Sequence, residues 1–230
     1  MVISGLQPFS KGWFHWNQLN GYLMPKVLNT DLLNMTMIIS RILSNDVIKI
    51  SGGIQPSSNV YLIKSRNALI DLGSKQNSKE IIRELKKYVS LENIDVVVFT
   101  HLHADHTGNP LIFNNAKFYA SKEELDSLNT PLNFADTGTL KKINLNELKK
   151  SITGLKVIKS PGHTAGSICL WKEDDKILFT GDTLFRTGAI GRTDLPTSMP
   201  KKMKGTLLKL AKFDYIEIAP GHNLEHERIL

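Results

Sequence analysis

Short apolar runs, each closed by glycine, asparagine or other polar residues, recur along the chain from Met37 onward. Runs of this kind, rich in valine, isoleucine and leucine and bounded by turn residues, are typical of β-strands. The first of them are separated only by turns such as Asn45-Asp46 and Gly52-Gly53, which predicts a strand-rich start to the domain. The predicted strands are residues 37–43, 47–50, 59–64, 68–71, 95–99, 117–120, 155–159, 168–171, 176–180 and 215–219.

Three segments predict helices instead. In residues 77–89 apolar side chains recur on one face, and Asn77 followed three residues later by Glu80 predicts an N-cap. Residues 121–128 open with S-K-E-E, the pattern of a capping box, and residues 198–210 predict a third helix that starts near a proline. We expect the first of these helices to cover the sheet.

Residues 1–36 differ from the rest of the chain. They contain Trp13 and Trp16 and show no sustained apolar period of about 2 or 3.6 residues. Three interpretations remain open: an ordered arm, a flexible leader, or translated upstream sequence with the true start at Met35 or Met37; we favour the last two. The sequence thus predicts one domain over residues 37–230, preceded by an atypical extension over residues 1–36.

The composition is that of a soluble globular protein. The chain has 230 residues, of which 41% are hydrophobic and 22% charged, which is enough for one well-packed core. The net charge of +7 raises the question of a nucleic-acid partner. The lysines, however, form short clusters without interleaved aromatic residues. This distribution favours solvated helix faces and predicts no specific nucleic-acid binding.

Location is predicted from what the pattern lacks. No apolar run approaches the about 18 residues that span a membrane, and residues 1–12 lack the pattern of a secretory signal. Cys169, the only cysteine, cannot form an intramolecular disulfide and is interpreted as a buried strand residue. We therefore expect a cytoplasmic protein without a membrane partner, and leave its oligomeric state open.

Residues 100–109 read T-H-L-H-A-D-H-T-G-N and follow directly on the predicted strand 95–99. Three histidines and one aspartate occupy six positions there, a density that neither a helix face nor a strand requires. Imidazole and carboxylate groups are ligands for zinc, iron and manganese, and a loop can turn alternate side chains toward one point. His101 and His103 could therefore serve one ion, and Asp105 and His106 a neighbouring one.

Three more residues of ligand type follow downstream. His163 lies in S-P-G-H-T-A-G-S, Asp182 in F-T-G-D-T and His222 in A-P-G-H-N, each just past a predicted strand. Strand ends of this kind meet at one edge of a sheet system, so seven side chains are expected to converge. Seven is the count for two metal ions with three private ligands each and one shared carboxylate. The predicted metal ligands are His101, His103, Asp105, His106, His163, Asp182 and His222.

At this point the chain resembles the metallo-β-lactamase-fold hydrolases. The resemblance rests on H-x-H-x-D-H, P-G-H-T-x-G, G-D-T-L-F, G-R-T-D and P-G-H, which occur in the family's order over residues 38–222. Within that family the chain is most similar to the glyoxalase II-like (hydroxyacylglutathione hydrolase-like) branch. The resemblance implies an α+β protein, a four-layer αββα sandwich, with a dinuclear site at one edge of the two sheets.

Full-length glyoxalase II enzymes add a C-terminal helical domain that contributes glutathione contacts. The chain ends eight residues after His222, so it resembles this branch without that domain, and recognition of glutathione is not implied. We expect Asp182 to bridge two divalent ions, zinc with iron or manganese as alternatives, and a bridging hydroxide to attack the substrate. Asp105 and Asp182 are the candidate catalytic residues, with Asp105 weighted as a ligand. The first ion is expected on His101, His103 and His163, and the second on Asp105, His106 and His222.

Four residues outside this set carry further expectations. In the family's pattern Asp71 would lie one shell behind the metals, although a turn-forming aspartate before Gly73 is an equal alternative. Arg192 and Asp194 of G-R-T-D are interpreted as an ion pair internal to their loop that holds its shape, with substrate contact by Arg192 as the less favoured alternative. Phe134, in a loop expected over residues 129–139, is a candidate to line a pocket.

The leading functional prediction is metal-dependent hydrolysis of a hydroxyacyl thioester, with an anionic small molecule as substrate. The first alternative is an oxidoreductase similar to persulfide dioxygenases, which would bind one iron through His101, His163 and Asp182. A lactonase or a phosphodiesterase working at the same site is the further alternative.

Overall fold

The computed structural model describes residues 15–19, 22–26, 37–130 and 134–223. The chain divides into two units, Met1–Met37 and Ile38–Leu230. In the first unit, β1 (His15–Leu19) pairs antiparallel with β2 (Tyr22–Lys26). The other residues predicted as an atypical extension lie outside the described ones, and the interpretations of that extension stay predictions.

The larger unit contains a seven-stranded sheet of mixed direction. Its strand order is β3-β4-β5-β6-β7-β8-β9, antiparallel from β3 to β6 and parallel from β6 to β9. Parallel neighbours end at the same edge of a sheet, which places the loops after β6 and β7 together. The strands are β3 (Ile38–Ile42), β4 (Val47–Gly52), β5 (Val60–Ile63), β6 (Ala68–Ile70), β7 (Val96–Val98), β8 (Lys117–Ala120) and β9 (Leu145–Glu147).

A second sheet has five strands in the order β10-β11-β12-β13-β14. Its neighbours are antiparallel except β13 and β14, which run parallel. Asp182 and His222, which follow β13 and β14, therefore leave this sheet at the same edge. The strands are β10 (Ser151–Ile152), β11 (Leu155–Lys159), β12 (Ile168–Lys172), β13 (Ile177–Gly181) and β14 (Glu217–Pro220).

The two sheets pack face to face over a shared apolar core. Tyr61 of the first sheet meets Phe179 of the second edge-on, with ring centroids 5.2 Å apart, and both side chains are buried. Large aromatic side chains buried between sheets contribute strongly to stability. The cluster combines residues of both sheets with Leu148, which directly follows β9: Val47, Tyr61, Ile63, Ala68, Ile70, Val98, Leu148, Leu155, Ile168, Leu170, Ile177, Phe179 and Ala219.

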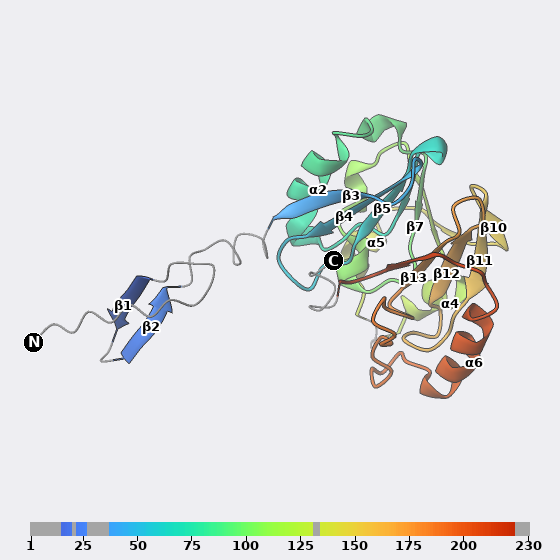
Figure 1. Cartoon of the computed structure of the whole chain (residues 1–230). Helices are drawn as coiled ribbons and strands as arrows, with labels where there is room; N and C mark the ends of the chain where they lie inside the picture. Colours follow the sequence, from blue (N-terminus) through green and yellow to red (C-terminus); the bar gives the residue numbers. More distant parts are fainter. Residues whose placement is uncertain (1–14, 20–21, 27–36, 131–133, 224–230) are drawn as a thin grey trace, which may run out of the picture. The chain divides into compact units, whose positions relative to one another are not determined.

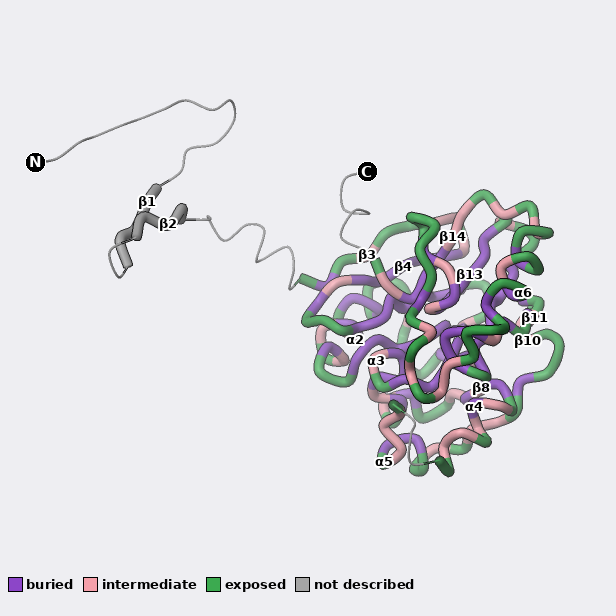
Figure 2. The backbone as a smooth tube through the Cα atoms, turned by 90° about the horizontal axis from the view of Figure 1, so that it is seen from below, coloured by how far each residue is buried: buried purple, intermediate pink, exposed green. Residues whose placement is uncertain are grey.

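Helices cover the outer faces of both sheets (Figure 1). Ile81 and Leu85 of α2 (Ser78–Leu85) pack into the outer cluster of the seven-stranded sheet, and Leu210 of α6 (Pro200–Leu210) packs against Trp171 and its neighbours on the other sheet. Strands such as β4 and β13 are consequently buried, whereas the covering helices alternate between buried residues and exposed ones (Figure 2). The predicted four-layer αββα sandwich is confirmed.

The remaining helices are short. Of these, α4 continues directly from β8 and α3 follows the histidine-rich loop. They are η1 (Lys64–Arg66), η2 (Lys75–Asn77), η3 (Leu91–Asn93), α3 (Ala104–Thr107), η4 (Pro110–Ile112), α4 (Lys122–Ser127) and α5 (Thr137–Leu140). No helix among the described residues is long and apolar enough to cross a membrane.

Every predicted strand is present, with ends within two residues of those observed, whereas β1, β2, β9 and β10 were not predicted. One detail was wrong: Asn77 precedes α2 but its side chain does not cap it. Instead the Asn77 amide accepts a hydrogen bond from the backbone NH of Ile54 (3.0 Å) and donates one to the Ile54 carbonyl (2.8 Å). A tertiary contact thus replaces the local cap. Part of the predicted 129–139 loop lies outside the described residues, and its end forms α5.

Candidate metal centre

The predicted ligands all follow strand ends. Strand β7 ends at Val98 and leads into the histidine-rich loop, while β13 and β14 end just before Asp182 and His222. The turn between β11 and β12 carries His163. The structure brings all seven predicted side chains together, in three overlapping groups whose ligand atoms lie within 4.8 Å of one another. The groups are His101, His103 and His163; His101, His106 and Asp182; and Asp105, His106 and His222.

The first group consists of three buried histidines. His103 Nδ1 lies 3.1 Å from His163 Nε2, so the two ring nitrogens face the same point. His163 Nδ1 lies 2.8 Å from the Arg192 carbonyl, to which it donates, and this leaves its Nε2 lone pair free. His101 Nε2 is buried and has no hydrogen-bond partner among the described residues.

A second group, formed by Asp105, His106 and His222, lies beside the first. His106 Nε2 and His222 Nε2 are 3.2 Å apart, and His222 Nε2 is 3.2 Å from Asp105 Oδ2. The His106 ring is oriented from behind, because its Nδ1 lies 2.8 Å from Asp71 Oδ2. Three donor atoms therefore converge here as well.

Asp182 lies between the two groups. Its Oδ1 is 3.3 Å from His106 Nε2, while its Oδ2 is 3.6 Å from His163 Nε2 and 3.5 Å from His222 Nε2. One carboxylate thus faces ligands of both groups.

The donor atoms fit a metal centre. His101 Nε2 is buried without a partner among the described residues, and a buried polar atom without a partner costs about 1–3 kcal/mol. Two ring nitrogens that face each other at about 3 Å are stabilised when both lone pairs bind the same cation. Nitrogen and oxygen donors of this kind suit zinc, iron and manganese. The residues present can therefore bind divalent metal.

The family model described as the metallo-beta-lactamase superfamily matches residues 53–222. The chain belongs to this superfamily. A probable metallo-hydrolase of Methanocaldococcus jannaschii is 30% identical over 193 residues, covering 76% of this chain and 92% of that protein. A hydroxyacylglutathione hydrolase of Francisella tularensis is 30% identical over 135 residues, which span 56% of this chain and 50% of that enzyme.

Solved structures of low sequence identity share the superfamily's fold. The protein TTHA1623 in a di-iron-bound form aligns with a TM-score of 0.60 at 24% identity, over 74% of this chain and 90% of that one. A subclass B3 metallo-beta-lactamase with an active-site glutamic acid aligns at 0.62 and 17%, over 86% and 84%. The flavodiiron protein of Giardia intestinalis aligns at 0.63 and 17%, over 82% of this chain and 56% of that one.

Electrostatics divide the histidines of this superfamily member into two kinds. Burial, reinforced by the neighbouring His106 and His103, places the pKa of His101 well below its usual value. Burial and His163 likewise lower the pKa of His103 to about 4. Both rings are therefore neutral at neutral pH and present lone pairs to a cation.

The second group is different because carboxylates surround it. Burial opposes the charged form of His222, but Asp182 and Asp105 outweigh it and raise its pKa to about 9. Asp182 and Asp71 also raise the pKa of His106 well above its usual value against the effect of burial. Burial raises the pKa of Asp105, yet its hydrogen bond with His222 and the charge of His106 bring it down to about 2. Without metal, these carboxylates favour the protonated forms of both histidines.

Metal uptake by the second group should release protons. His106 and His222 must give up the Nε2 proton to bind a cation, whereas neutral His101 and His103 have none to release. Because the pKa of His222 is raised to about 9, apparent affinity at this group should increase as the pH rises toward that value. Calorimetric titration of metal-free protein in buffers of different ionisation enthalpy measures the released protons. Uptake of both ions with no proton release would contradict this assignment.

Asp71 behaves as the outer residue that the resemblance implied. It has a left-handed backbone (φ 55°), a conformation that aspartate tolerates better than most residues. Its Oδ1 accepts from Thr100 N (2.8 Å), and its Oδ2 accepts from Thr100 Oγ1 (2.7 Å) as well as from His106. Asp71 therefore fixes both the start of the histidine-rich loop and the orientation of a ligand.

Two glycines let the backbone approach the centre. A Cβ at Gly221 would collide with Asp182 Oδ1 and would lie 2.8 Å from the His106 ring. A Cβ at Gly191 would collide with the Asp182 carbonyl. This explains physically why glycine precedes His222 in P-G-H and opens G-R-T-D.

The predicted Arg192–Asp194 ion pair within its loop is present, on the surface of the protein. The pair forms with Arg192 Nη2 2.9 Å from Asp194 Oδ2, and the two side chains are 70% and 68% exposed. It is the Arg192 carbonyl that contacts the centre, through His163.

Cys169 is fully buried, as predicted, and burial raises its pKa to about 11.

An open cavity of about 770 Å³ lies over the centre, with His103 and Asp105 in its lining. Phe134 lines it, as the sequence suggested, and its ring centroid lies 5.4 Å from that of His103. Ser74 and Lys75 also line it, and sequence reasoning missed both. Their only signal was their place shortly after Asp71, at the end of a strand that leads to the same sheet edge.

Proposed function

We propose that the chain is a two-metal hydrolase that cleaves an acyl thioester. The position of Asp182, which faces ligands of both three-residue groups, is the observation that carries this proposal. Membership of the metallo-beta-lactamase superfamily and the similarity to probable metallo-hydrolases support an enzyme. The similarity to hydroxyacylglutathione hydrolases supports a thioester as the substrate.

The roles of the residues follow from the geometry. His101, His103 and His163 would bind one ion, Asp105, His106 and His222 the other, and Asp182 both. Divalent ions there, zinc in this proposal and iron or manganese as alternatives, would polarise the substrate carbonyl and supply hydroxide from water near neutral pH. Asp182 would then fix the position of the reacting atoms between the two groups, and Asp105 would act as a metal ligand. Buried Cys169, with its raised pKa, is not a nucleophile.

The cavity supports a substrate with apolar and anionic parts. Phe134 and Leu195 offer apolar surface, while the cationic side chains of Lys75 and Arg192 line the same space. Each cation is also paired with an aspartate, Asp136 or Asp194, which an anionic substrate group would have to replace or join. A thiolate is a good leaving group near neutral pH, so a thioester needs little acid assistance from the protein.

A substrate panel tests the proposal. Zinc-loaded protein should hydrolyse lactoylglutathione or a simpler thioester faster than an acyl homoserine lactone or a phosphodiester, and Asp182→Ala protein prepared in parallel is the control. A further arm offers glutathione persulfide to iron-loaded protein and records oxygen uptake. Turnover of the persulfide alone would overturn the hydrolase proposal in favour of an oxidoreductase, and turnover of the lactone or phosphodiester alone would reject the thioester.

A further inference from the structure

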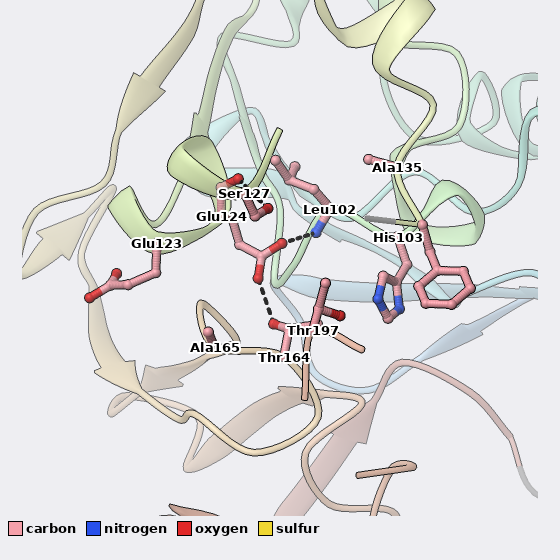
Figure 3. A pocket seen from close by; sticks show the side chains of 10 residues that line it. Leu102, His103, Glu123, Glu124, Ser127, Ala135, Thr164, Ala165 and Thr197 are labelled. Carbon is pink, nitrogen blue, oxygen red and sulfur yellow. Dashed lines mark hydrogen bonds between the residues drawn. The ribbon is translucent and has the colours of Figure 1, made fainter. Parts of the chain in front are cut away.

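Glu124 is a buried carboxylate beside the centre, on the first turn of α4. Its side chain is not among the predicted ligands, and the residue is 4% exposed. The sequence predicts a capping box, and half of it forms, since Ser121 Oγ accepts a hydrogen bond from Glu124 N (3.3 Å). The Glu124 carboxylate, however, points away from the helix end toward Leu102 and Thr164, which lie in the two loops that carry His101, His103 and His163 (Figure 3).

The two oxygens of this carboxylate contact two different loops. Oε2 accepts a hydrogen bond from the backbone NH of Leu102 (2.9 Å), and Oε1 accepts one from Thr164 Oγ1 (2.5 Å), as Figure 3 shows. Leu102 lies between His101 and His103, and Thr164 directly follows His163. Glu124 therefore joins the segments that supply all three histidines of the first group.

Helix α4 is itself firmly attached to the His163 loop. Ser121 Oγ donates to the Gly166 carbonyl (2.7 Å), and a Cβ at Gly166 would lie 2.6 Å from Glu124 N, so the loop touches the helix backbone. Ser127 Oγ donates to the Glu124 carbonyl (2.7 Å). The carboxylate is consequently presented from a fixed base.

A carboxylate in this position is costly. Burial raises the pKa of Glu124, against the hydrogen bonds from Thr164 and Leu102. A side chain that only filled space could be apolar and would avoid the desolvation of a charged group. The geometry that a carboxylate supplies, two acceptors at a fixed separation, is what an apolar side chain lacks.

We propose that Glu124 is a positioning residue that sets the spacing between the His101–His103 segment and the His163 loop. It thereby tunes the affinity of the three-histidine group, and not of the Asp105–His106–His222 group, which Asp71 supports. The inference rests on the proposed function in so far as these histidines bind metal.

The test compares three variants with the wild type by competition titration of metal-free protein against a chromophoric chelator. Glu124→Ala should weaken binding at the three-histidine group by about 10-fold or more and leave the second group nearly unchanged. Glu124→Gln should recover most of the loss, because its amide oxygen can accept from Leu102 N and its NH₂ can donate to Thr164. Leu125→Ala, a partly buried core contact on the same helix, is the stability control and should leave both affinities intact.

A second readout does not depend on metal. Hydrogen exchange at the Leu102 amide should be faster in metal-free Glu124→Ala than in the wild type, Glu124→Gln or Leu125→Ala. If Glu124→Ala does not fold, Thr164→Val removes one of the two hydrogen bonds at similar volume and should weaken the same group. If the wild type binds two ions and Glu124→Ala or Thr164→Val binds both with wild-type affinity, the inference is overturned while the proposed function stands. Wild-type protein that binds no metal would overturn the proposed function.

Discussion

Asp182→Ala should reduce hydrolysis by orders of magnitude. Asp182 is the carboxylate whose two oxygens face ligands of both groups. Its loss leaves His106 and His222 without one of the two carboxylates that raise the pKa of each ring, and leaves the two groups without a shared ligand. Some metal should remain on the histidines, so the loss of turnover should exceed the loss of metal.

Two variants control for this result. Asp174→Ala removes an exposed aspartate from the turn between β12 and β13, away from the centre, and should change turnover only slightly. Asp182→Asn keeps the shape but not the charge and should lose activity nearly as completely. Steady-state turnover and metal content are measured on the same preparations. An Asp182→Ala protein that retains wild-type turnover would rule out the bridging role.

Asp71→Ala should lower the metal affinity of the Asp105–His106–His222 group by about 10- to 100-fold, and turnover with it. Without the carboxylate, His106 Nδ1 loses a buried partner 2.8 Å away, and Thr100 loses the acceptor of both its NH and its hydroxyl. The ring can then turn away from its ligand position.

The prediction is tested by asking whether the loss of metal affinity is greater at the Asp105–His106–His222 group than at the three-histidine group. The same chelator competition should show a smaller change at the three-histidine group, the reverse of the pattern expected for Glu124→Ala. Asp95→Ala, an exposed aspartate just before β7, is the matched control and should leave both groups unchanged. Equal losses at both groups would indicate general destabilisation rather than orientation of His106.

Much of the fold could be read from local pattern. Strands of this protein are short and bounded by turn residues, so apolar runs such as D-V-V-V-F predicted strands with nearly the observed bounds. The ligands were found because metal-binding residue types are rare at such density directly after predicted strands. The clustering of His163, Asp182 and His222 with the first loop then followed from the rule that strand ends share an edge.

Tertiary partners could not be read in the same way. Asn77 and Glu124 carry local capping patterns, yet one side chain contacts Ile54 and the other contacts Leu102 and Thr164. A capping pattern specifies only neighbours in sequence, and a distant backbone NH leaves no trace in it. The Arg192–Asp194 pair illustrates the converse, since the two residues are close in sequence and the predicted contact forms.

Metal content tests the central claim most directly. Protein purified without chelator, or reconstituted from the metal-free form, is analysed for transition metals per chain alongside its thioester turnover. Two groups of three ligands that share Asp182 predict about two ions per chain at full occupancy, with turnover reaching its maximum only as the second ion binds. One ion or fewer at saturation, or full turnover with a single ion, would contradict the account.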